Sequence, residues 1–305
     1  AESATLSKAE KQLVVTTIVD TNAGRLPLVL GIGGNDTQAV IKELETTNVS
    51  AFTAILSVSP YYNKPSQEGI YQHFAAISRA SEKPIIIYNV PGRTASNINP
   101  VTVKRLATQF ENIIGIKEAS GDLNQVKQLI INKPDDFLVI SGDDNTAYQS
   151  VLMGGDGVIS VIAGCIPKEF SEIINLSMEK KESESQSKFK IVKPLLDYLF
   201  LEGNPSGIKS ALHKLNLCEN ILRLPLVPVS DELKSQLLIN KIHQTTGGAS
   251  EIILELGAYG LPVGELAVVL KPLVVPVLKP ITSFALKQSS KLLMTKNLVH
   301  LENAL

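Results

Sequence analysis

The sequence predicts an α/β protein with a (β/α)8 TIM barrel, followed by a small C-terminal helical domain. Short runs of β-branched and aliphatic residues recur with little polar alternation, which is typical of strands buried on both faces of a parallel sheet. Helical patterns separate these runs, and this alternation predicts either a doubly wound sheet or a barrel. Polar residues gather where the strands end. This favours the barrel, whose active site lies at that rim.

Each expected element rests on its own local pattern. The expected strands are 26–32, 51–58, 84–90, 112–117, 137–142 and 156–161. The helices expected with them are 5–21, 36–47, 66–81, 100–110, 121–132, 145–153 and 167–180. Pro100 suits a first helical turn, and Asp122 or Ser120 suits an N-cap. Glu10 follows Ser7 by three residues, which indicates a capping box.

Strand patterns stop after residue 180, which sets the expected domain boundaries. Helical patterns at about 186–201, 205–216 and 230–240 predict a helical domain over 181–240. The barrel would then occupy 1–180 as the catalytic domain. Residues 241–305 form a tail of unknown structure, marked by the composition shift at TTGGAS.

The strand count raises a question about the barrel. A closed barrel needs eight strands, and the sequence shows six, with the deficit before the first helix. The first two strands are therefore expected to be absent from this chain. Three interpretations stay open, in this order: a truncated chain with an unrelated tail, a tail that replaces the strands, and a circular permutant. The helical pattern of KLLMTKNLVHLENAL and the prolines of LKPLVVPVLKP disfavour the permutant.

Composition excludes several functional classes. The chain has 305 residues, 44% of them hydrophobic, and a net charge of −1, so neither nucleic acid nor anionic lipid is an expected partner. The apolar tail is broken by charges and prolines before it reaches the ~20 residues of a membrane span. Two distant cysteines suit a reducing cytoplasm, and the start does not resemble a signal peptide.

Lys117 carries the first chemical signal, because it ends the apolar run IIGIK. A free lysine has a pKa of about 10.4, so at pH 7 only about one in 2,500 has the lone pair that attacks a carbonyl. Burial lowers the pKa of an amine, which is why lysines that form Schiff bases lie in apolar sites. The protonated imine would then favour an enamine that attacks an aldehyde. The alternatives are that Lys117 reaches into solvent or pairs with Glu118 or Asp122.

The neighbouring strand end, YNVPGRT, adds a phenol at Tyr88 and a guanidinium at Arg93. A phenol can relay a proton, and an arginine can hold a carboxylate with two parallel hydrogen bonds. The alternatives are an ordinary rim tyrosine and a surface ion pair. Tyr61 and Tyr62 follow another strand end, where adjacent aromatic residues more often serve as an interface.

These motifs together resemble a known family. YYNKPSQEGIYQHF, YNVPGRT, GIKEASGD, SGDD, GGDGVISV and LRLPLVPVS, in this order, are similar to 4-hydroxy-tetrahydrodipicolinate (dihydrodipicolinate) synthases of the pyruvate-dependent class I aldolase and N-acetylneuraminate lyase family. The resemblance runs from residue 1 to about 238. It implies a homotetramer that condenses pyruvate with aspartate 4-semialdehyde in lysine (diaminopimelate) biosynthesis. It also implies no metal and no organic cofactor, because the intermediate is a covalent lysine–pyruvate imine.

The resemblance also assigns roles to residues. It implies that Lys117 is the Schiff-base lysine, Tyr88 the proton-relay tyrosine and Arg93 the group that binds the semialdehyde carboxylate. Tyr62 would reach across a dimer interface into the neighbouring subunit. Gly142 and Ile159 would line the site through backbone groups. Five residues would lie near an allosteric cleft that binds lysine: Ser3, Ala4, Lys8, Asn35 and Tyr61. Ala39 stands where many relatives carry a glutamate, so weak or absent lysine inhibition is expected.

The family pattern and this chain also differ. In the family a Gly-Thr-Thr triplet with a relay threonine precedes the segment that opens this chain. Two alternatives to the synthase therefore stay open: a sugar-acid lyase of the same family, against which Arg93 and YYNKP argue, and a non-catalytic remnant whose barrel cannot close.

Other signals have simpler interpretations. GIGGN lacks the spacing of a nucleotide loop and predicts a tight strand-to-helix turn. Asp143 and Asp144 predict a turn at the rim rather than a metal site, since no histidine joins them. His73 predicts a packed or interface histidine. The serines have no GxSxG elbow, so a serine hydrolase is not supported.

Overall fold

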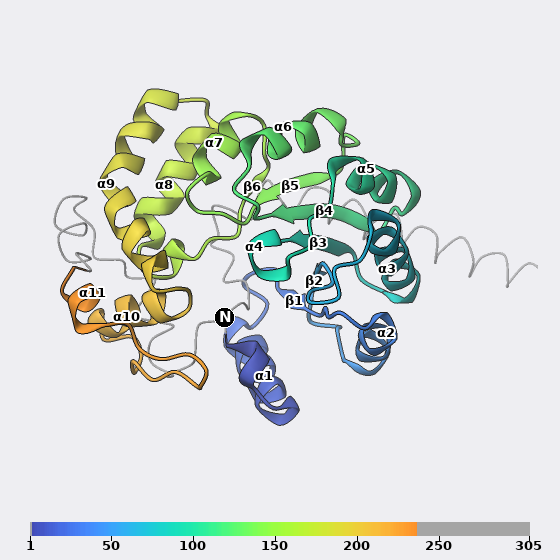
Figure 1. Ribbon diagram of the computed structural model, residues 1–305, viewed down its shortest axis with the longest axis horizontal. Helices are drawn as coiled ribbons and strands as arrows, with labels where there is room; N and C mark the ends of the chain where they lie inside the picture. Colours follow the sequence, from blue (N-terminus) through green and yellow to red (C-terminus); the bar gives the residue numbers. More distant parts are fainter. Residues whose placement is uncertain (1, 237–305) are drawn as a thin grey trace, which may run out of the picture.

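A curved sheet of six parallel strands forms the centre of the protein in the computed structural model, which describes residues 2–236 (Figure 1). The strands are β1 (Val29–Gly31), β2 (Ala54–Val58), β3 (Ile85–Asn89), β4 (Ile113–Glu118), β5 (Leu138–Ser141) and β6 (Gly157–Val158). Each pairs with the next along the chain, and helices connect them. All six expected strands form, and the barrel class is confirmed.

Helices cover the outer face of the sheet and extend beyond its β6 edge (Figure 1). The longer helices that follow the strands are α2 (Thr37–Thr46), α3 (Gln67–Ala80), α5 (Pro100–Gln109), α6 (Leu123–Asn132), α7 (Ala147–Leu152) and α8 (Pro167–Met178), with α4 (Pro91–Thr94) and the short η2 (Ile162–Gly164) in loops. The chain opens with η1 (Ser3–Thr5) and α1 (Lys8–Asn22), and α9 (Glu182–Leu201), α10 (Ser206–Lys214) and α11 (Asp231–Gln236) follow α8.

The expected helix starts form for the expected reasons. Ser7 caps α1 by accepting a hydrogen bond from the backbone N–H of Glu10, whose side chain accepts from the backbone N–H of Ser7, so the capping box is confirmed. Asp122, not Ser120, is the N-cap of α6. Pro100 is the first residue of α5, where its missing N–H costs nothing.

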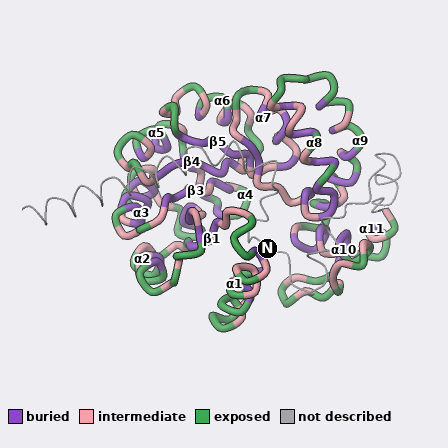
Figure 2. Tube along the Cα trace, turned by 180° about the vertical axis from the view of Figure 1, so that it is seen from behind, coloured by how far each residue is buried: buried purple, intermediate pink, exposed green. Residues whose placement is uncertain are grey.

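The strands are largely buried (Figure 2), and two apolar clusters lie on the two faces of the sheet. Residues such as Ile87, Ile116 and Val139 pack outward against helices α2, α3, α5 and α6. A smaller cluster contains only residues on or next to the strands and therefore marks the inner face: Val29, Ala54, Ile86, Ile114, Leu138 and Ile140, with Leu56 and Ile159 at its border. A side chain at a strand end can thus be assigned to one face by its neighbours.

The helices after β6 pack on one another and on α7, and they reach back to the start of the chain. Helices α7 to α10 share one buried cluster, which includes Phe170 and Leu196. Lys209 of α10 forms a largely buried ion pair with Glu2 at 2.7 Å, and Arg223 pairs with Glu10 at 2.5 Å. The end of the expected helix at 230–240 and the tail at 241–305 lie outside the described residues.

Candidate active site

Lys117 lies near the carboxyl end of β4 and faces the inside of the sheet. Its cross-strand partners are Tyr88 on β3 and Ile140 on β5, and Ile140 belongs to the inner cluster. The side chain is 9% exposed, and its Nζ lies 4.1 Å from the centre of the Tyr88 ring. Of the arrangements that the sequence left open, a reach into solvent is wrong, and Glu118 is the next residue on the strand, on the opposite face. Lys117 is buried, and successive strand residues point to opposite faces.

A β-bulge decides that Lys117 faces inward. Residues two apart on a regular strand share a face, yet Ile114 packs in the inner cluster and Ile116 in the outer one. The pairing of β3 with β4 explains this, because Ile85 pairs with Ile113 while the next residue, Ile86, pairs with Gly115. One extra residue on β4 reverses the alternation beyond it. Bulges next to active sites commonly redirect a side chain in this way, and the sequence pattern did not reveal this one.

Gly115 and Gly142 permit two close approaches around this strand. A Cβ atom at Gly115 would lie 2.8 Å from Cβ of Leu138 on β5. A Cβ atom at Gly142 would lie 2.9 Å from both Cγ and Cε of Lys117. The backbone N–H of Gly142 donates to the carbonyl of Glu118 at 2.7 Å, which continues the pairing of β4 with β5. Gly142 therefore flanks the lysine stem directly.

Arg93 lies in α4, which directly follows β3 at the same rim of the sheet (Figure 1). Its guanidinium is exposed and donates from Nη2 to the backbone carbonyl of Asn204, 3.1 Å away. Asn204 belongs to the loop between α9 and α10. The short helix α4 thus positions Arg93 at the barrel rim. No local sequence signal predicted its contact with Asn204.

Ile159 and Asp144 border the site from the β6 side. Ile159 follows β6, donates its N–H to the carbonyl of Ser141 at 2.9 Å and packs against the inner cluster. The buried Asp144 carboxylate accepts from the backbone N–H groups of Val161 and Ile162, at 2.9 and 2.8 Å. Burial raises the pKa of Asp144 to about 6, although these hydrogen bonds oppose the rise. Asp144 therefore holds the loop that carries Ile159.

The adjacent tyrosines take different positions from Tyr88. Tyr62 is 88% exposed and has a positive φ of 71°, so its ring does not enter the Lys117 site of its own chain. Tyr61 is also exposed, and its carbonyl accepts from Nδ2 of Asn35 at 3.1 Å. The structure therefore brings Tyr61 and Asn35 together.

The other residues expected near the lysine cleft lie at the start of the chain. Ser3 and Ala4 are exposed in η1, and Lys8 is the exposed first residue of α1.

His73 is buried in α3, and its Nδ1 lies 2.9 Å from the Thr37 hydroxyl, as expected for a packed histidine. Burial lowers the pKa of His73 to about 4, so its ring is neutral at pH 7.

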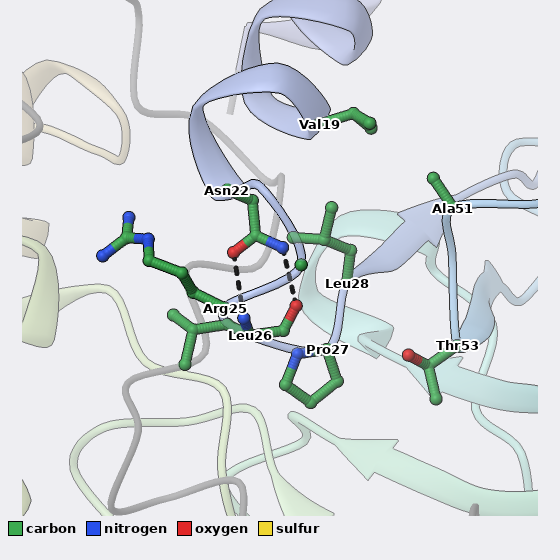
Figure 3. A pocket seen from close by; sticks show the side chains of 9 residues that line it. Val19, Asn22, Arg25, Leu26, Pro27, Leu28, Ala51 and Thr53 are labelled. Carbon is green, nitrogen blue, oxygen red and sulfur yellow. Dashed lines mark hydrogen bonds between the residues drawn. The ribbon is translucent and has the colours of Figure 1, made fainter.

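A hollow of about 360 Å³ lies at the other end of the sheet (Figure 3). Leu28 precedes β1 and Thr53 precedes β2, so both line it at the amino ends of parallel strands. Lys117 sits near a carboxyl end, and this hollow is therefore separate from the lysine site.

Within residues 2–236, no group of three or more His, Cys, Asp and Glu side chains is arranged to hold a metal ion, and no helix is both long and apolar enough to span a membrane.

The fold and the site together define a (β/α)-barrel protein built around an inward-facing lysine at the carboxyl ends of its strands. Comparison with known proteins gives the family. The family model described as the dihydrodipicolinate synthetase family matches residues 1–244. The 4-hydroxy-tetrahydrodipicolinate synthase of Flavobacterium psychrophilum is 57% identical over 237 residues, which are 78% of this chain and 81% of the relative.

Solved structures agree with this match. The chloride-inhibited dihydrodipicolinate synthase of Acinetobacter baumannii, complexed with pyruvate, is 39% identical with a TM-score of 0.75, over 81% of this chain and 84% of that one. The DHDPS of Cyanidioschyzon merolae with lysine bound is 32% identical with a TM-score of 0.74, over 80% and 83%. This chain belongs to the dihydrodipicolinate synthetase family. The predicted family is confirmed, and the predicted lyase of lysine biosynthesis agrees with the names of these relatives.

Proposed function

We propose that this chain condenses pyruvate with aspartate 4-semialdehyde through an imine on Lys117. The observation that carries the proposal is the buried amine of Lys117, 4.1 Å from the Tyr88 ring centre at the carboxyl rim of the sheet. Two further facts support it: the chain belongs to this family, and a solved relative is complexed with pyruvate.

The lysine amine supplies the proposed chemistry. Its neutral form attacks the keto carbon of pyruvate, water leaves, and an imine forms. The protonated imine withdraws electrons, so the methyl carbon loses a proton and becomes an enamine. That carbon then attacks the aldehyde carbon of the semialdehyde, whose oxygen takes up a proton to become a hydroxyl, and the imine forms again on Lys117. The substrate's own amine displaces Lys117 from the imine carbon, which closes the ring and frees the lysine. The protonated imine is the electron sink, so the proposal requires neither a metal nor an organic cofactor.

Neighbouring groups take the remaining roles. Tyr88 is placed to move a proton to and from the oxygen that leaves as water. Arg93 uses one donor on Asn204 and has further N–H groups for a substrate carboxylate. Gly142 leaves room for the lysine stem, and Ile159 lines the β6 side.

The proposal extends to assembly and location. We infer a homo-oligomer, a tetramer by resemblance, in which Tyr62 enters a neighbouring subunit, and its 88% exposure in a backbone with positive φ supports this. A cytoplasmic location is supported by two free cysteines, Cys165 and Cys218. Light scattering at several protein concentrations tests the assembly, and a monomer at every concentration would contradict it.

Borohydride trapping tests the function. The protein is incubated with pyruvate and borohydride, digested and mapped by mass spectrometry. An adduct on Lys117 is expected, and Lys117→Arg should abolish it whereas Lys104→Arg, in α5, should not. Turnover is then compared between the semialdehyde and sugar acids. An adduct spread over surface lysines, or none, would overturn the proposal, and preference for a sugar acid would change the substrate.

A further inference from the structure

We propose that Glu118 and Asn89 act as positioning residues that hold β4 in the bulged register and thereby keep Lys117 inside the barrel. The inference rests on the proposed function, because it concerns the lysine that would form the imine. Its observations are independent of that function. They are the strand register, the burial of one carboxylate and the donors that surround it.

Two residue pairs stand side by side on β3 and β4. Tyr88 pairs with Lys117, and the next pair is Asn89 with Glu118. Successive strand residues point to opposite faces, so the first pair faces inward and the second faces the helices. The outward pair is hydrogen-bonded, because Nδ2 of Asn89 donates to both carboxylate oxygens of Glu118, at 3.2 and 2.9 Å.

Glu118 is buried among neutral donors. It is 2% exposed, and it also accepts from Nε2 of Gln125 at 2.9 Å and from the backbone N–H of Ser120 at 2.7 Å. A carboxylate can only accept hydrogen bonds, and every one of these groups donates. Burying a carboxylate without such donors is costly, so Glu118 is stable only where these groups meet it.

The donors exist for Glu118 in one register only. Without the extra residue at Ile114, positions 117 and 118 would exchange faces, since a shift of one residue turns every side chain to the other side of a sheet. Lys117 would then face the helices, and Glu118 would enter the barrel away from Asn89 and Gln125. The hydrogen bonds of Glu118 therefore disfavour the register in which Lys117 would point away from the barrel interior.

The same hydrogen bonds also fix the loop that follows α4, the short helix that carries Arg93. Oδ1 of Asn89 accepts from the backbone N–H of Ile98 at 2.9 Å, and Nδ2 of Asn89 donates to Asn97 at 2.8 Å. Asn97 donates in turn to Gln125 of α6 at 2.8 Å. One group of amides around a buried carboxylate thus ties β3, β4, α6 and the loop after α4 together.

Glu118→Gln is the direct test. Either oxygen that becomes an NH₂ group would meet at least two donors, because Asn89 and Ser120 donate to one oxygen and Asn89 and Gln125 to the other. We expect trapping of pyruvate on Lys117 at saturating pyruvate to slow about ten- to a hundredfold, as for a misplaced reacting group. Asn89→Asp places two carboxylates together and should have a similar effect. The exchanged pair Asn89→Asp with Glu118→Gln restores a donor facing an acceptor and should recover part of the rate.

A stability control separates positioning from general damage. Tyr71→Phe removes a hydroxyl that donates to Gln109 between α3 and α5, away from the site, and should lower the melting temperature without slowing trapping. If Glu118→Gln does not fold, Gln125→Ala removes one donor near the surface, and trapping several times slower is expected. Trapping at the wild-type rate in the folded variants would overturn the inference.

Failure of the proposed function gives a different result. If the wild type traps no pyruvate, an amine-labelling reagent followed by peptide mapping still reports the register. Lys117 should be labelled slowly in the wild type and at a different rate in Glu118→Gln, because its side chain changes face, while the exposed Lys104 is labelled alike in both. Equal labelling of Lys117 in the two proteins would overturn the inference by itself.

Discussion

Replacing Gly142 by alanine should slow the trapping of pyruvate on Lys117 about ten- to a hundredfold. The new Cβ atom would lie 2.9 Å from Cγ and Cε of Lys117 and 2.8 Å from Cβ of Ala119. Carbon atoms in contact prefer about 3.5–4.0 Å, so the lysine stem must move by about 0.6 Å or more. A displacement of about 1 Å at a reacting group can cost roughly 100-fold in rate.

The same substitution should lower stability but leave the protein folded, so the rate effect can be measured on folded protein. Overpacking costs about 1–3 kcal/mol, or about 2–4 °C in melting temperature for each kcal/mol in a protein of this size. Gly92→Ala, in α4 at the same rim, meets no atom within 4 Å and is the matched control. The assay quenches pyruvate and borohydride reactions at successive times and maps the adduct. Trapping by Gly142→Ala at the rate of Gly92→Ala would refute the reasoning.

Three further predictions concern stability. Gly115→Ala puts a Cβ atom 2.8 Å from Cβ of Leu138 and should lower the free energy of unfolding by about 1–3 kcal/mol in urea, unlike Gly31→Ala, which meets open space. Ser7→Ala removes the cap of α1 and should cost about 0.5–2 kcal/mol by thermal melt; no change would deny the cap any role. The pKa of Asp144 is raised to about 6 in the folded state, above 3.8, so its contribution is complete below about pH 4 and is lost as pH rises through 6. Asp144→Asn keeps an acceptor, and its stability relative to wild type should rise by up to about 3 kcal/mol between pH 4 and 7 in denaturant titrations; a constant difference would contradict the shift.

Several site residues could be placed from the sequence because strand ends are local signals. Lys117 and Tyr88 each end an apolar run, and in parallel strands those ends meet at one rim, so their proximity was predictable. Gln125 and Asn97 were missed. Their signal was weak, since polar residues on a helix and in a loop are common, and only the position of Glu118 gives them a purpose.

The sequence by itself determined the order and type of the elements, because a period of two or 3.6 residues, a capping serine and a proline in the first turn act over a few neighbouring positions. It also determined which residues stand at the strand ends. Only the tertiary structure decided which face of the sheet Lys117 points to. The bulge is a property of how the residues of β4 pair with those of β3, so the sequence of β4 alone does not show it. The contact of Arg93 with Asn204 likewise joins residues 111 positions apart, and only the packed chain brings them together.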